Sequence, residues 1–316
     1  MHLRPPATGK EPAVITVYHP EHPHSYIAAL SRLLPGHTVS DQSEPCTRYA
    51  VVWNPPEGFF SGLSGLQGIF ALGAGVDRLL GRHDLSPDIP IYRLTDAGMA
   101  EQMIEYARYG VLHWQRSFDF YRTQQQAQQW QVQPDRRKAD TRISVLGLGE
   151  MGGRVAAALA GDGYCVSGYS RKMRTLAGVN CVHGEDQLNA LLTQTDVLIN
   201  LLPSTVLTRG LLNTERLALL PAGSALIHAG RGDQLDENAL LAALDSGVLR
   251  FALLDVFALE PLAAGHPLWR HPRAIITPHS AAQTLIGEAA AQIAQRIQAL
   301  EQGQEVTGKV ERSRAY

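Results

Sequence analysis

The feature of this sequence that most constrains its fold is a glycine motif that joins an apolar run to a helical stretch. Segment 141–153 reads TRISVLGLGEMGG, in which the strand-like run Ile143–Leu146 leads into three glycines with GxGxxG spacing. A helical stretch, Arg154–Ala160, and a second strand-like run, Tyr164–Tyr169, follow in order. A lone GxGxxG is weak evidence, but this strand–turn–helix–strand order is typical of a dinucleotide-binding domain.

Each glycine of the motif has its own physical task. Gly147 allows the tight turn, Gly149 lets the backbone approach a pyrophosphate, and Gly152 permits close helix packing. The N-terminus of the following helix offers unpaired N–H groups to the anion. The turn is therefore predicted to bind a cofactor through Gly147, Gly149, Glu150, Met151 and Gly152.

The end of the second strand predicts which dinucleotide binds. An NAD site normally carries Asp or Glu there, to hold the ribose 2′-hydroxyl. This chain instead has Ser170, Arg171, Lys172 and Arg174. A carboxylate would repel a 2′-phosphate, whereas a hydroxyl and an arginine would bind it. We expect NADP(H) as the cofactor, with NAD(H) as the weaker alternative; a solvated basic loop is the competing interpretation.

Three short apolar runs in the C-terminal half each lead to an ionisable residue. The runs are Ser224–His228, Phe251–Val256 and Ala274–Thr277. In an open parallel sheet, ligands bind beyond the carboxyl ends of the strands. If the runs are buried parallel strands, one rim of the sheet gathers a guanidinium, a carboxylate and an imidazole: Arg231, Glu260 and His279.

The N-terminal third alternates strand-like and helix-like segments, which indicates a parallel sheet of its own. We expect an α/β protein with two Rossmann-like domains and parallel sheets, the larger of which binds the dinucleotide. The discontinuous substrate-binding domain is predicted at 1–104 and 284–316, and the NADP-binding domain at 105–283. A mostly helical segment, 98–130, is expected to cross between them, and a helix over 285–302 to return to the first. Further expected elements are strands at 13–18, 49–53, 68–72 and 89–93 and a helix at 25–34.

Composition excludes several other classes of protein. The chain has 316 residues, a net charge of −2 and 45% hydrophobic residues, so neither a nucleic acid nor a membrane is expected as partner. No apolar run reaches the ~18 residues of a membrane span. The start, MHLRPPATGKEP, lacks the apolar stretch of a signal peptide and is expected to be a short extension. Three cysteines without a CxxC pair fit buried thiols in a reducing cytoplasm.

Together these motifs resemble the D-2-hydroxyacid dehydrogenase family over nearly the whole chain. The likeness rests on GAGVD at 73–77, GLGEMG at 147–152, LLPSTVLT at 201–208, GRG at 230–232, LDVFALEPL at 254–262 and TPHSA at 277–281. Within the family it is similar to the bacterial glyoxylate/hydroxypyruvate reductases of type A, through phrases such as VVWNPP, GMAEQM and the ending KVERSRAY.

The resemblance implies a role for each rim residue. Arg231 would clamp the substrate carboxylate, for which its planar fork suits better than lysine. His279 would donate a proton to the carbonyl oxygen, and Glu260 would orient the imidazole. The amides of Ala74 and Gly75 would bind the carboxylate. Asp255 would contact the carboxamide end of the cofactor. Further cofactor contacts are expected at Leu202, Pro203, Thr208, Ala229, Gly230, His279 and Ala281.

Several further positions bear on the predicted site. Trp53, at a strand end before Asn54–Pro55–Pro56, fits either the core or the substrate pocket, and we assign it to the pocket. His19, His22 and His24 lack a completing ligand pattern, so no metal is expected. Many relatives carry asparagine where this chain has His228 and alanine in place of Gly230, which predicts a small local change.

The predicted activity is NADPH-dependent reduction of small 2-oxo acids: glyoxylate to glycolate and hydroxypyruvate to D-glycerate. Two alternatives stay open at this point. One is a dehydrogenase for a bulkier, for example aromatic, 2-hydroxy acid. The other is a non-catalytic, dinucleotide-sensing binding protein. The resemblance also implies a homodimer built through the nucleotide domains.

Overall fold

The structure, a computed structural model, describes residues 12–73 and 75–312. The chain forms two compact units, one of residues 1–98 and 284–316 and the other of residues 99–283. The predicted boundary at 283/284 coincides with the observed boundary between the two units. The other predicted division, at 104/105, differs because helix α3 (Met99–Gln115) runs unbroken through it and belongs to the second unit.

The first unit contains a five-stranded sheet whose paired strands are all parallel. The strand order is β2-β1-β3-β4-β5. Its strands are β1 (Val14–Tyr18), β2 (Thr38–Ser40), β3 (Thr47–Val52), β4 (Gly68–Ala71) and β5 (Ile91–Arg93). Its helices are α1 (Pro23–Leu33), α2 (Asp77–Leu80) and α9 (Ile286–Glu301).

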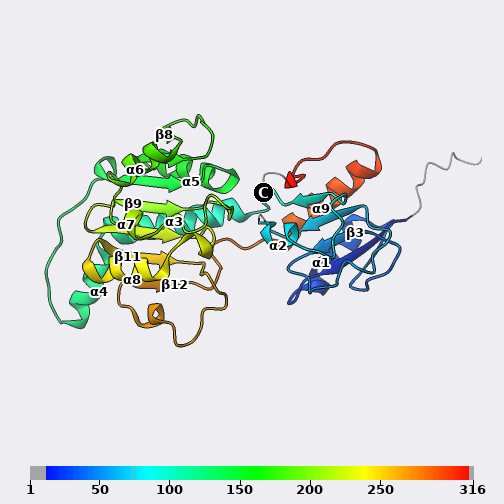
Figure 1. Cartoon of the computed structure of the whole chain (residues 1–316), viewed down its shortest axis with the longest axis horizontal. Coiled ribbons are helices and arrows are strands. Elements are labelled where there is room, and N and C mark those ends of the chain that lie inside the picture. Colours follow the sequence, from blue (N-terminus) through cyan, green and yellow to red (C-terminus); the bar gives the residue numbers. More distant parts are fainter. Residues whose placement is uncertain (1–11, 74, 313–316) are drawn as a thin grey trace, which may run out of the picture. The chain divides into compact units, whose positions relative to one another are not determined.

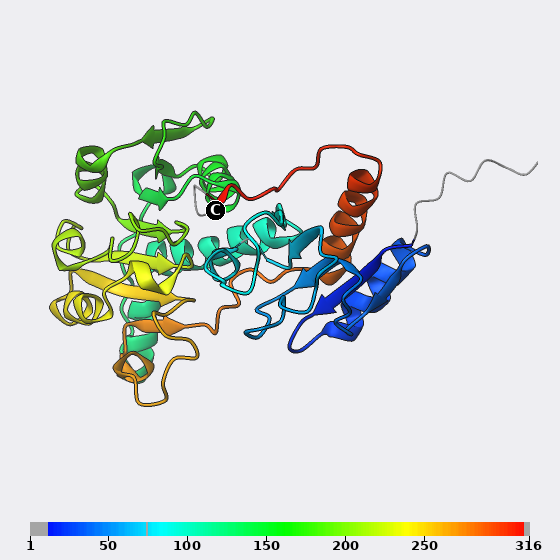
Figure 2. The same cartoon turned by 45° about the vertical axis from the view of Figure 1, so that its right-hand side comes forward.

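Helix α9 comes from the C-terminal part of the chain and packs on α1, where Figures 1 and 2 show it beside the N-terminal elements. Its buried stripe includes Ala290, Ile293 and Ile297, spaced three and four residues apart. Residues at that spacing share one face of a helix. The predicted return of the last helix to the first domain is therefore confirmed.

The second unit contains a seven-stranded sheet, again with parallel pairing throughout. The strand order is β12-β11-β10-β9-β6-β7-β8. Its strands are β6 (Arg142–Leu146), β7 (Cys165–Tyr169), β8 (Val179–Val182), β9 (Val197–Asn200), β10 (Ser224–His228), β11 (Leu249–Leu254) and β12 (Ala274–Ile276). With α3, its helices are α4 (Phe118–Gln126), α5 (Glu150–Gly161), α6 (Glu185–Leu192), α7 (Thr214–Leu217) and α8 (Glu237–Ser246). Short 3₁₀ turns are η1 (Lys138–Asp140), η2 (Gly232–Gln234) and η3 (Pro267–Arg270).

Both faces of this sheet are covered, because successive side chains of a strand point to opposite faces. In β9, Leu198 joins the core that includes residues of α6 and α8, whereas Val197 and Ile199 join the core with α3 and α5. The same alternation in β10 divides Leu226 from Ile227. Continuous apolar strands such as these are the mark of a doubly covered parallel sheet, and the predicted α/β class is confirmed.

Some local predictions were incomplete or wrong. The expected helical segment 98–130 is two helices, because Ser117 lies in the left-handed region (φ 55°) between α3 and α4. The edge strands β2 and β8 were not predicted, since they are short and half-exposed. The expectation of buried thiols was wrong for Cys46 and Cys165, which are both exposed.

Candidate active site

Three neighbouring strands of the second unit end at the same level. Strand β11 pairs with β10 on one side and with β12 on the other, and His228, Leu254 and Ile276 lie in register as their last residues. Because the three strands are parallel, the loops that follow them leave the sheet at one edge. These loops carry the three predicted rim residues: Arg231 after β10, Glu260 after β11 and His279 after β12.

Glu260 and His279 form a hydrogen-bonded pair. His279 Nδ1 lies 2.9 Å from Glu260 Oε2. The other carboxylate oxygen, Oε1, accepts the main-chain N–H of Phe257 at 3.1 Å. A carboxylate held in this way fixes the orientation of the imidazole ring. The Nδ1 atom is then the nitrogen bonded to Glu260, and Nε2 is left to exchange a proton with a ligand.

Asp255, which directly follows β11, holds the His279 loop through hydrogen bonds. The buried Asp255 carboxylate accepts three hydrogen bonds, from Thr277 Oγ1 at 2.6 Å, Ser280 N at 2.8 Å and Ala281 N at 3.0 Å. Its main-chain carbonyl accepts His279 N–H at 2.9 Å. These bonds hold His279 in the left-handed region (φ 53°), which is unfavourable for a non-glycine residue.

Tyr106 of helix α3 adds a hydrogen bond to the group of residues that holds the His279 loop. Tyr106 Oη lies 2.7 Å from Thr277 Oγ1, and since that hydroxyl donates to Asp255, Tyr106 must be the donor. Burial raises the pKa of Tyr106, an effect that the hydrogen bond to Thr277 opposes. Tyr106 therefore stays protonated over the physiological range and keeps its donor role.

The Arg231 loop lies directly against the loop that carries Glu260. A Cβ atom on Gly232 would come within 2.0 Å of the Phe257 carbonyl oxygen and 2.4 Å of Ala258 N. Only glycine allows two backbones to approach so closely. Arg231 itself is partly buried, and its Nη1 donates to the carbonyl of Gly230 at 2.8 Å. A guanidinium-bearing loop thus adjoins the loop of the Glu260–His279 pair.

The glycine turn has the geometry that its motif predicts. Gly147 has φ 98°, and a Cβ there would lie 2.7 Å from the Leu201 carbonyl oxygen. A Cβ on Gly152 would lie 1.7 Å from the Gly147 carbonyl oxygen, so helix α5 packs on the turn only with glycine. Gly149, the N-cap of α5, is exposed, and a Cβ there would meet open space. The first turn of α5 is thereby open to an anion.

The predicted 2′-phosphate site follows β7 directly. Arg171, Lys172 and Arg174 are exposed, and Ser170 Oγ donates to the carbonyl of Lys172 at 2.7 Å. Ser170 N–H donates to the Val182 carbonyl, which fastens the start of this run to β8. The run therefore leaves the sheet at the same edge as the glycine turn after the neighbouring strand β6.

Comparison with known proteins identifies the family. Residues 109–281 match the family model described as D-isomer specific 2-hydroxyacid dehydrogenase, NAD binding domain. The structure is similar to a D-isomer specific 2-hydroxyacid dehydrogenase from Xanthobacter autotrophicus Py2 solved with NADPH and MES, at 38% identity and TM-score 0.92, over 97% of this chain and 100% of that one.

The chain belongs to the D-isomer specific 2-hydroxyacid dehydrogenases.

Two further solved structures are similar to this dehydrogenase. One is a family member from Klebsiella pneumoniae 342, at 40% identity and TM-score 0.86, covering 95% of this chain and 97% of that one. The other is the NADPH-dependent glyoxylate/hydroxypyruvate reductase of Sinorhizobium meliloti solved with NADP and sulfate, at 32% identity and TM-score 0.90, covering 97% and 100%. The predicted family and its enzymatic, oxidoreductase character are confirmed.

Most of the remaining predicted cofactor residues of the dehydrogenase lie around the ends of β9 and β10. Leu202 is buried, and Pro203 accepts Thr208 Oγ1 at 2.7 Å through its carbonyl. Ala229 and Gly230 follow β10 directly. Three predicted residues remain. Glu150 pairs with Arg154 at 2.9 Å, Met151 is partly buried in the first turn of α5, and Ala281 is buried with its amide bonded to Asp255.

The predicted substrate residues of the first unit are described only in part. Ala74 lies outside the described residues, and Gly75 is partly buried. Trp53 is also partly buried, and its ring lies over Gly73, where an added Cβ would come within 2.3 Å of it. The indole thus packs against the start of the GAGV segment.

His19 and His22 make local contacts. His19 Nδ1 accepts the amides of Glu21 and His22, and the rings of His19 and His22 stack with centroids 5.3 Å apart. Within residues 12–73 and 75–312, no group of three or more His, Cys, Asp or Glu side chains is arranged to hold a metal ion. None of the helices described in those ranges has the length and hydropathy that a membrane crossing needs.

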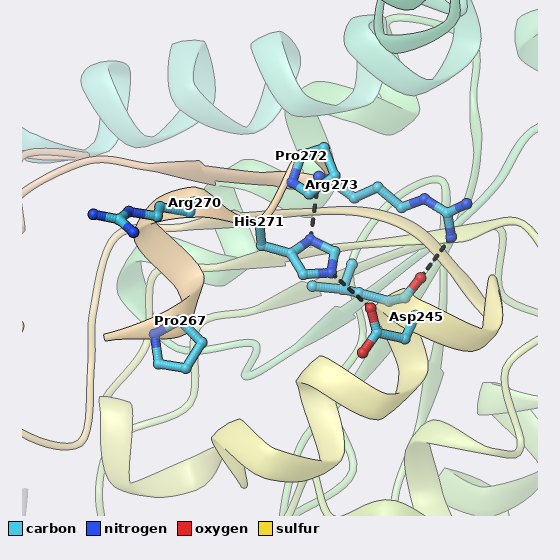
Figure 3. Close-up of a pocket in the computed structure, with 7 residues that line it drawn as sticks. Asp245, Pro267, Arg270, His271, Pro272 and Arg273 are labelled. Atoms are coloured by element: carbon cyan, nitrogen blue, oxygen red, sulfur yellow. Dashed lines mark hydrogen bonds and ion pairs between the residues drawn. The ribbon is translucent and has the colours of Figure 1, made fainter. Parts of the chain in front are cut away.

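A surface hollow in the second unit lies away from these residues (Figure 3). It is lined by Leu244, Asp245, Pro267, Arg270, His271, Pro272 and Arg273. These residues precede β11 and β12, so the hollow lies at the amino ends of the strands, opposite the edge that carries His279. His271 and Arg273 are already bonded to Asp245 and the Leu244 carbonyl, and Figure 3 shows Arg270 pointing elsewhere. The hollow gathers no converging groups for the chemistry of a dehydrogenase.

Sequence reasoning missed four residues that organise the site. Tyr106 and Thr277 extend the Asp255 anchor, and Asn200 and Gln234 bond to one another below the Arg231 loop. Thr277 could have been found, because it begins the TPHSA segment. The other three carry little local signal, since most of their partners lie 28 to 171 residues away.

Proposed function

We propose that this dehydrogenase reduces small 2-oxo acids with NADPH, converting glyoxylate to glycolate and hydroxypyruvate to D-glycerate. The observation that carries the proposal is the Glu260–His279 pair, held at the strand ends beside the Arg231 loop. An imidazole oriented by a carboxylate supplies a proton donor, and the guanidinium supplies the complement of a carboxylate.

Each residue of the proposed site has its own role in the reaction. Arg231 binds the substrate carboxylate and brings the 2-oxo group toward His279. NADPH, when bound, supplies the hydride that reduces C2 of the substrate. His279 gives the Nε2 proton to the carbonyl oxygen, which becomes the hydroxyl group. Glu260 keeps Nδ1 engaged so that Nε2 faces the substrate. Asp255 holds the loop, and its remaining acceptor capacity is available to the carboxamide of the cofactor.

The residues present fit NADP(H). The open Gly149 and the first turn of α5 suit a pyrophosphate, and Ser170 with the exposed basic run suits a 2′-phosphate. Relatives at 38% and 32% identity were solved with NADPH and NADP. We assign the cofactor contacts to the residues predicted above and NAD(H) as the weaker substitute.

We assign Trp53, Ala74 and Gly75 of the first unit to substrate binding. Trp53 packs over Gly73, which begins the segment that contains the other two residues. The proposed roles of the two units are substrate binding for residues 1–98 and 284–316 and cofactor binding for residues 99–283.

The proposed assembly is a cytoplasmic homodimer. Large apolar side chains are exposed on α3, on α4 and in the segment after them: Tyr109, Leu112, Phe118, Phe120, Trp130 and Val132. Trp130 is 99% exposed, and an apolar surface of this kind marks an interface. A second copy is the occupant proposed for it. The cytoplasm is proposed because the three cysteines are free.

Light scattering at micromolar concentration tests the assembly. The expected mass is twice that of the chain, and Phe118→Asp with Trp130→Asp should halve it. Trp269→Asp, which alters an exposed tryptophan outside this surface, should leave the dimer intact. A monomeric mass for the wild type would refute the homodimer.

The activity is tested by NADPH oxidation with glyoxylate, hydroxypyruvate, pyruvate and phenylpyruvate. The two small hydroxylated or aldehydic acids should give the highest kcat/KM. His279→Ala should lower turnover by roughly 10²–10⁴-fold while leaving NADPH binding nearly intact. Preference for phenylpyruvate would favour the bulkier-acid alternative. Absence of turnover with all four acids would favour a dinucleotide-sensing binding protein.

A further inference from the structure

Three polar side chains are completely buried next to the Arg231 loop. They are Asn200 at the end of β9, His228 at the end of β10 and Gln234 in η2, each with 0% exposure. Asn200 Nδ2 lies 2.7 Å from Gln234 Oε1 and 3.1 Å from His228 Nδ1. Because the Asn200 amide donates both bonds, His228 accepts through Nδ1 and carries its own hydrogen on Nε2. Within the described residues, the buried His228 Nε2 has no hydrogen-bond partner, so the network holds His228 through Nδ1.

The network continues into the backbone of Arg231. Gln234 Oε1 accepts Arg231 N–H at 3.1 Å, and the Arg231 carbonyl accepts Gln234 N–H at 3.1 Å. The other end of the Gln234 amide, Nε2, donates to the carbonyls of Leu202 at 2.9 Å and Pro203 at 2.8 Å. One side chain therefore ties the Arg231 segment to the loop after β9.

Gly230 lies directly against the same network. A Cβ at this position would lie 2.6 Å from Gln234 Oε1 and 3.0 Å from the Leu202 carbonyl oxygen. The Gly230 carbonyl also accepts Arg231 Nη1 at 2.8 Å. The backbone at Gly230 thus touches the network on one side and holds the guanidinium on the other.

We propose that Asn200, His228 and Gln234 are positioning residues that set where the Arg231 guanidinium meets the substrate carboxylate. The proposal rests on the proposed function, in which Arg231 is the carboxylate ligand. An arginine side chain is long and flexible, so the fixed points near its base determine its reach. A displacement of about 1 Å at a binding group can cost roughly 10²-fold in rate.

Two substitutions of Gln234 separate positioning from stability. Gln234→Leu removes every hydrogen bond of the side chain at similar volume. Gln234→Glu keeps an acceptor for Arg231 and Asn200, and when its carboxyl group is protonated it also keeps a donor for the Leu202 and Pro203 carbonyls. Thr195→Val is the matched control, because it removes a buried 2.7 Å bond to Ser144 in the same unit, before the amino end of β9.

The KM for glyoxylate at saturating NADPH is the first readout. Gln234→Leu should raise it by about tenfold or more, while Thr195→Val should leave it within about twofold. In Gln234→Glu the KM should be close to that of the wild type in mildly acidic buffer and should rise with pH. Ionisation places a carboxylate, which cannot donate, next to the carbonyl oxygens of Leu202 and Pro203. An unchanged KM in Gln234→Leu, or a Gln234→Glu profile parallel to that of the wild type, would overturn the proposal.

Deuterium exchange of the peptide over 229–235 is the second readout and needs no activity. Exchange there should be faster in Gln234→Leu than in the wild type and unchanged in Thr195→Val. A wild type without activity toward 2-oxo acids would refute the proposed function alone, and exchange would still decide whether the network holds the loop. Equal exchange in Gln234→Leu and the wild type would overturn the network proposal itself.

Discussion

His279 Nδ1 lies 2.9 Å from Glu260 Oε2, although the two residues follow different strands and are 19 positions apart. The histidine side chain is 45% exposed and the glutamate side chain 24%. The carboxylate is therefore the more sheltered partner, and the main-chain N–H of Phe257 fixes it from behind. This arrangement orients a solvent-accessible imidazole without burying it.

Glu260→Gln should lower kcat by roughly 10²–10⁴-fold. A glutamine lacks the negative charge that stabilises the protonated imidazole, and its amide can donate to Nδ1, which holds the ring in its neutral form. Single-turnover reduction of glyoxylate measures the effect. Asp245→Asn is a matched control, because Asp245 faces His271 at 3.2 Å at the opposite, amino end of the strands, and it should keep kcat within a few fold. Equal losses in the two variants would remove Glu260 from its orienting role.

Arg231→Lys should reduce kcat/KM for glyoxylate by about 10- to 100-fold, because lysine keeps the charge and loses the bidentate fork. The NADPH dissociation constant should change much less. Arg209→Lys, on an exposed arginine that pairs with Asp233, is the control and should be neutral. If cofactor affinity fell as far as kcat/KM, Arg231 would belong to the cofactor site instead.

The wild type should prefer NADPH to NADH by at least about tenfold, since one charged hydrogen bond contributes roughly 1.5–3 kcal/mol. Ser170→Asp combined with Arg171→Ala should reverse the preference, because an acid accepts the ribose 2′-hydroxyl and repels a phosphate. The comparison is kcat/KM for both cofactors at fixed glyoxylate. Equal use of the two cofactors by the wild type would identify the basic run as a solvated loop.

His228 should make stability depend on pH. Burial lowers its pKa from 6.5 to about 4, an effect that the Arg231 backbone and Asp233 partly oppose. Between these values the unfolded chain binds a proton that the folded chain does not. The stabilisation is thus present above about pH 6.5 and lost as pH falls toward 4, by up to roughly 3 kcal/mol.

Thermal unfolding of the wild type and His228→Asn across this range measures that dependence. The variant lacks the titrating group, so the Tm advantage of the wild type should shrink as the buffer is acidified. His113, whose pKa burial also lowers, is present in both proteins and cancels in the comparison. A Tm difference that is constant with pH would show that His228 titrates alike in the folded and unfolded chains.

Gly230→Ala should lower kcat/KM for glyoxylate by about tenfold. The added Cβ would lie 2.6 Å from Gln234 Oε1 and would push that oxygen away from its partners. In a Gln234→Ala background the same change should cost less, since that oxygen is gone. A double-mutant cycle measures the coupling. Gly161→Ala, where a Cβ meets open space at the end of α5, is the control. Additive effects would mean that Gly230 acts independently of Gln234.

The sequence predicted the local pieces of this protein well. The strands at 143–146 and 224–228, the helix after the glycine turn and the helix over 285–302 are all present, because apolar periodicity and glycine spacing act over a few residues. The order of Arg231, Glu260 and His279 after successive apolar runs also predicted a shared rim, and the parallel pairing of β10, β11 and β12 provides it.

The sequence by itself thus determined the α/β class and the family, and it predicted the residues to which we assign the chemistry. Only the tertiary structure decided how those residues are held: Asp255 under the His279 turn, Tyr106 on Thr277, and Asn200 between His228 and Gln234. The physical reason is that a buried polar side chain must find a partner wherever the packed strands bring one. These partners lie 22 to 171 residues apart, and no local pattern encodes which of them will meet.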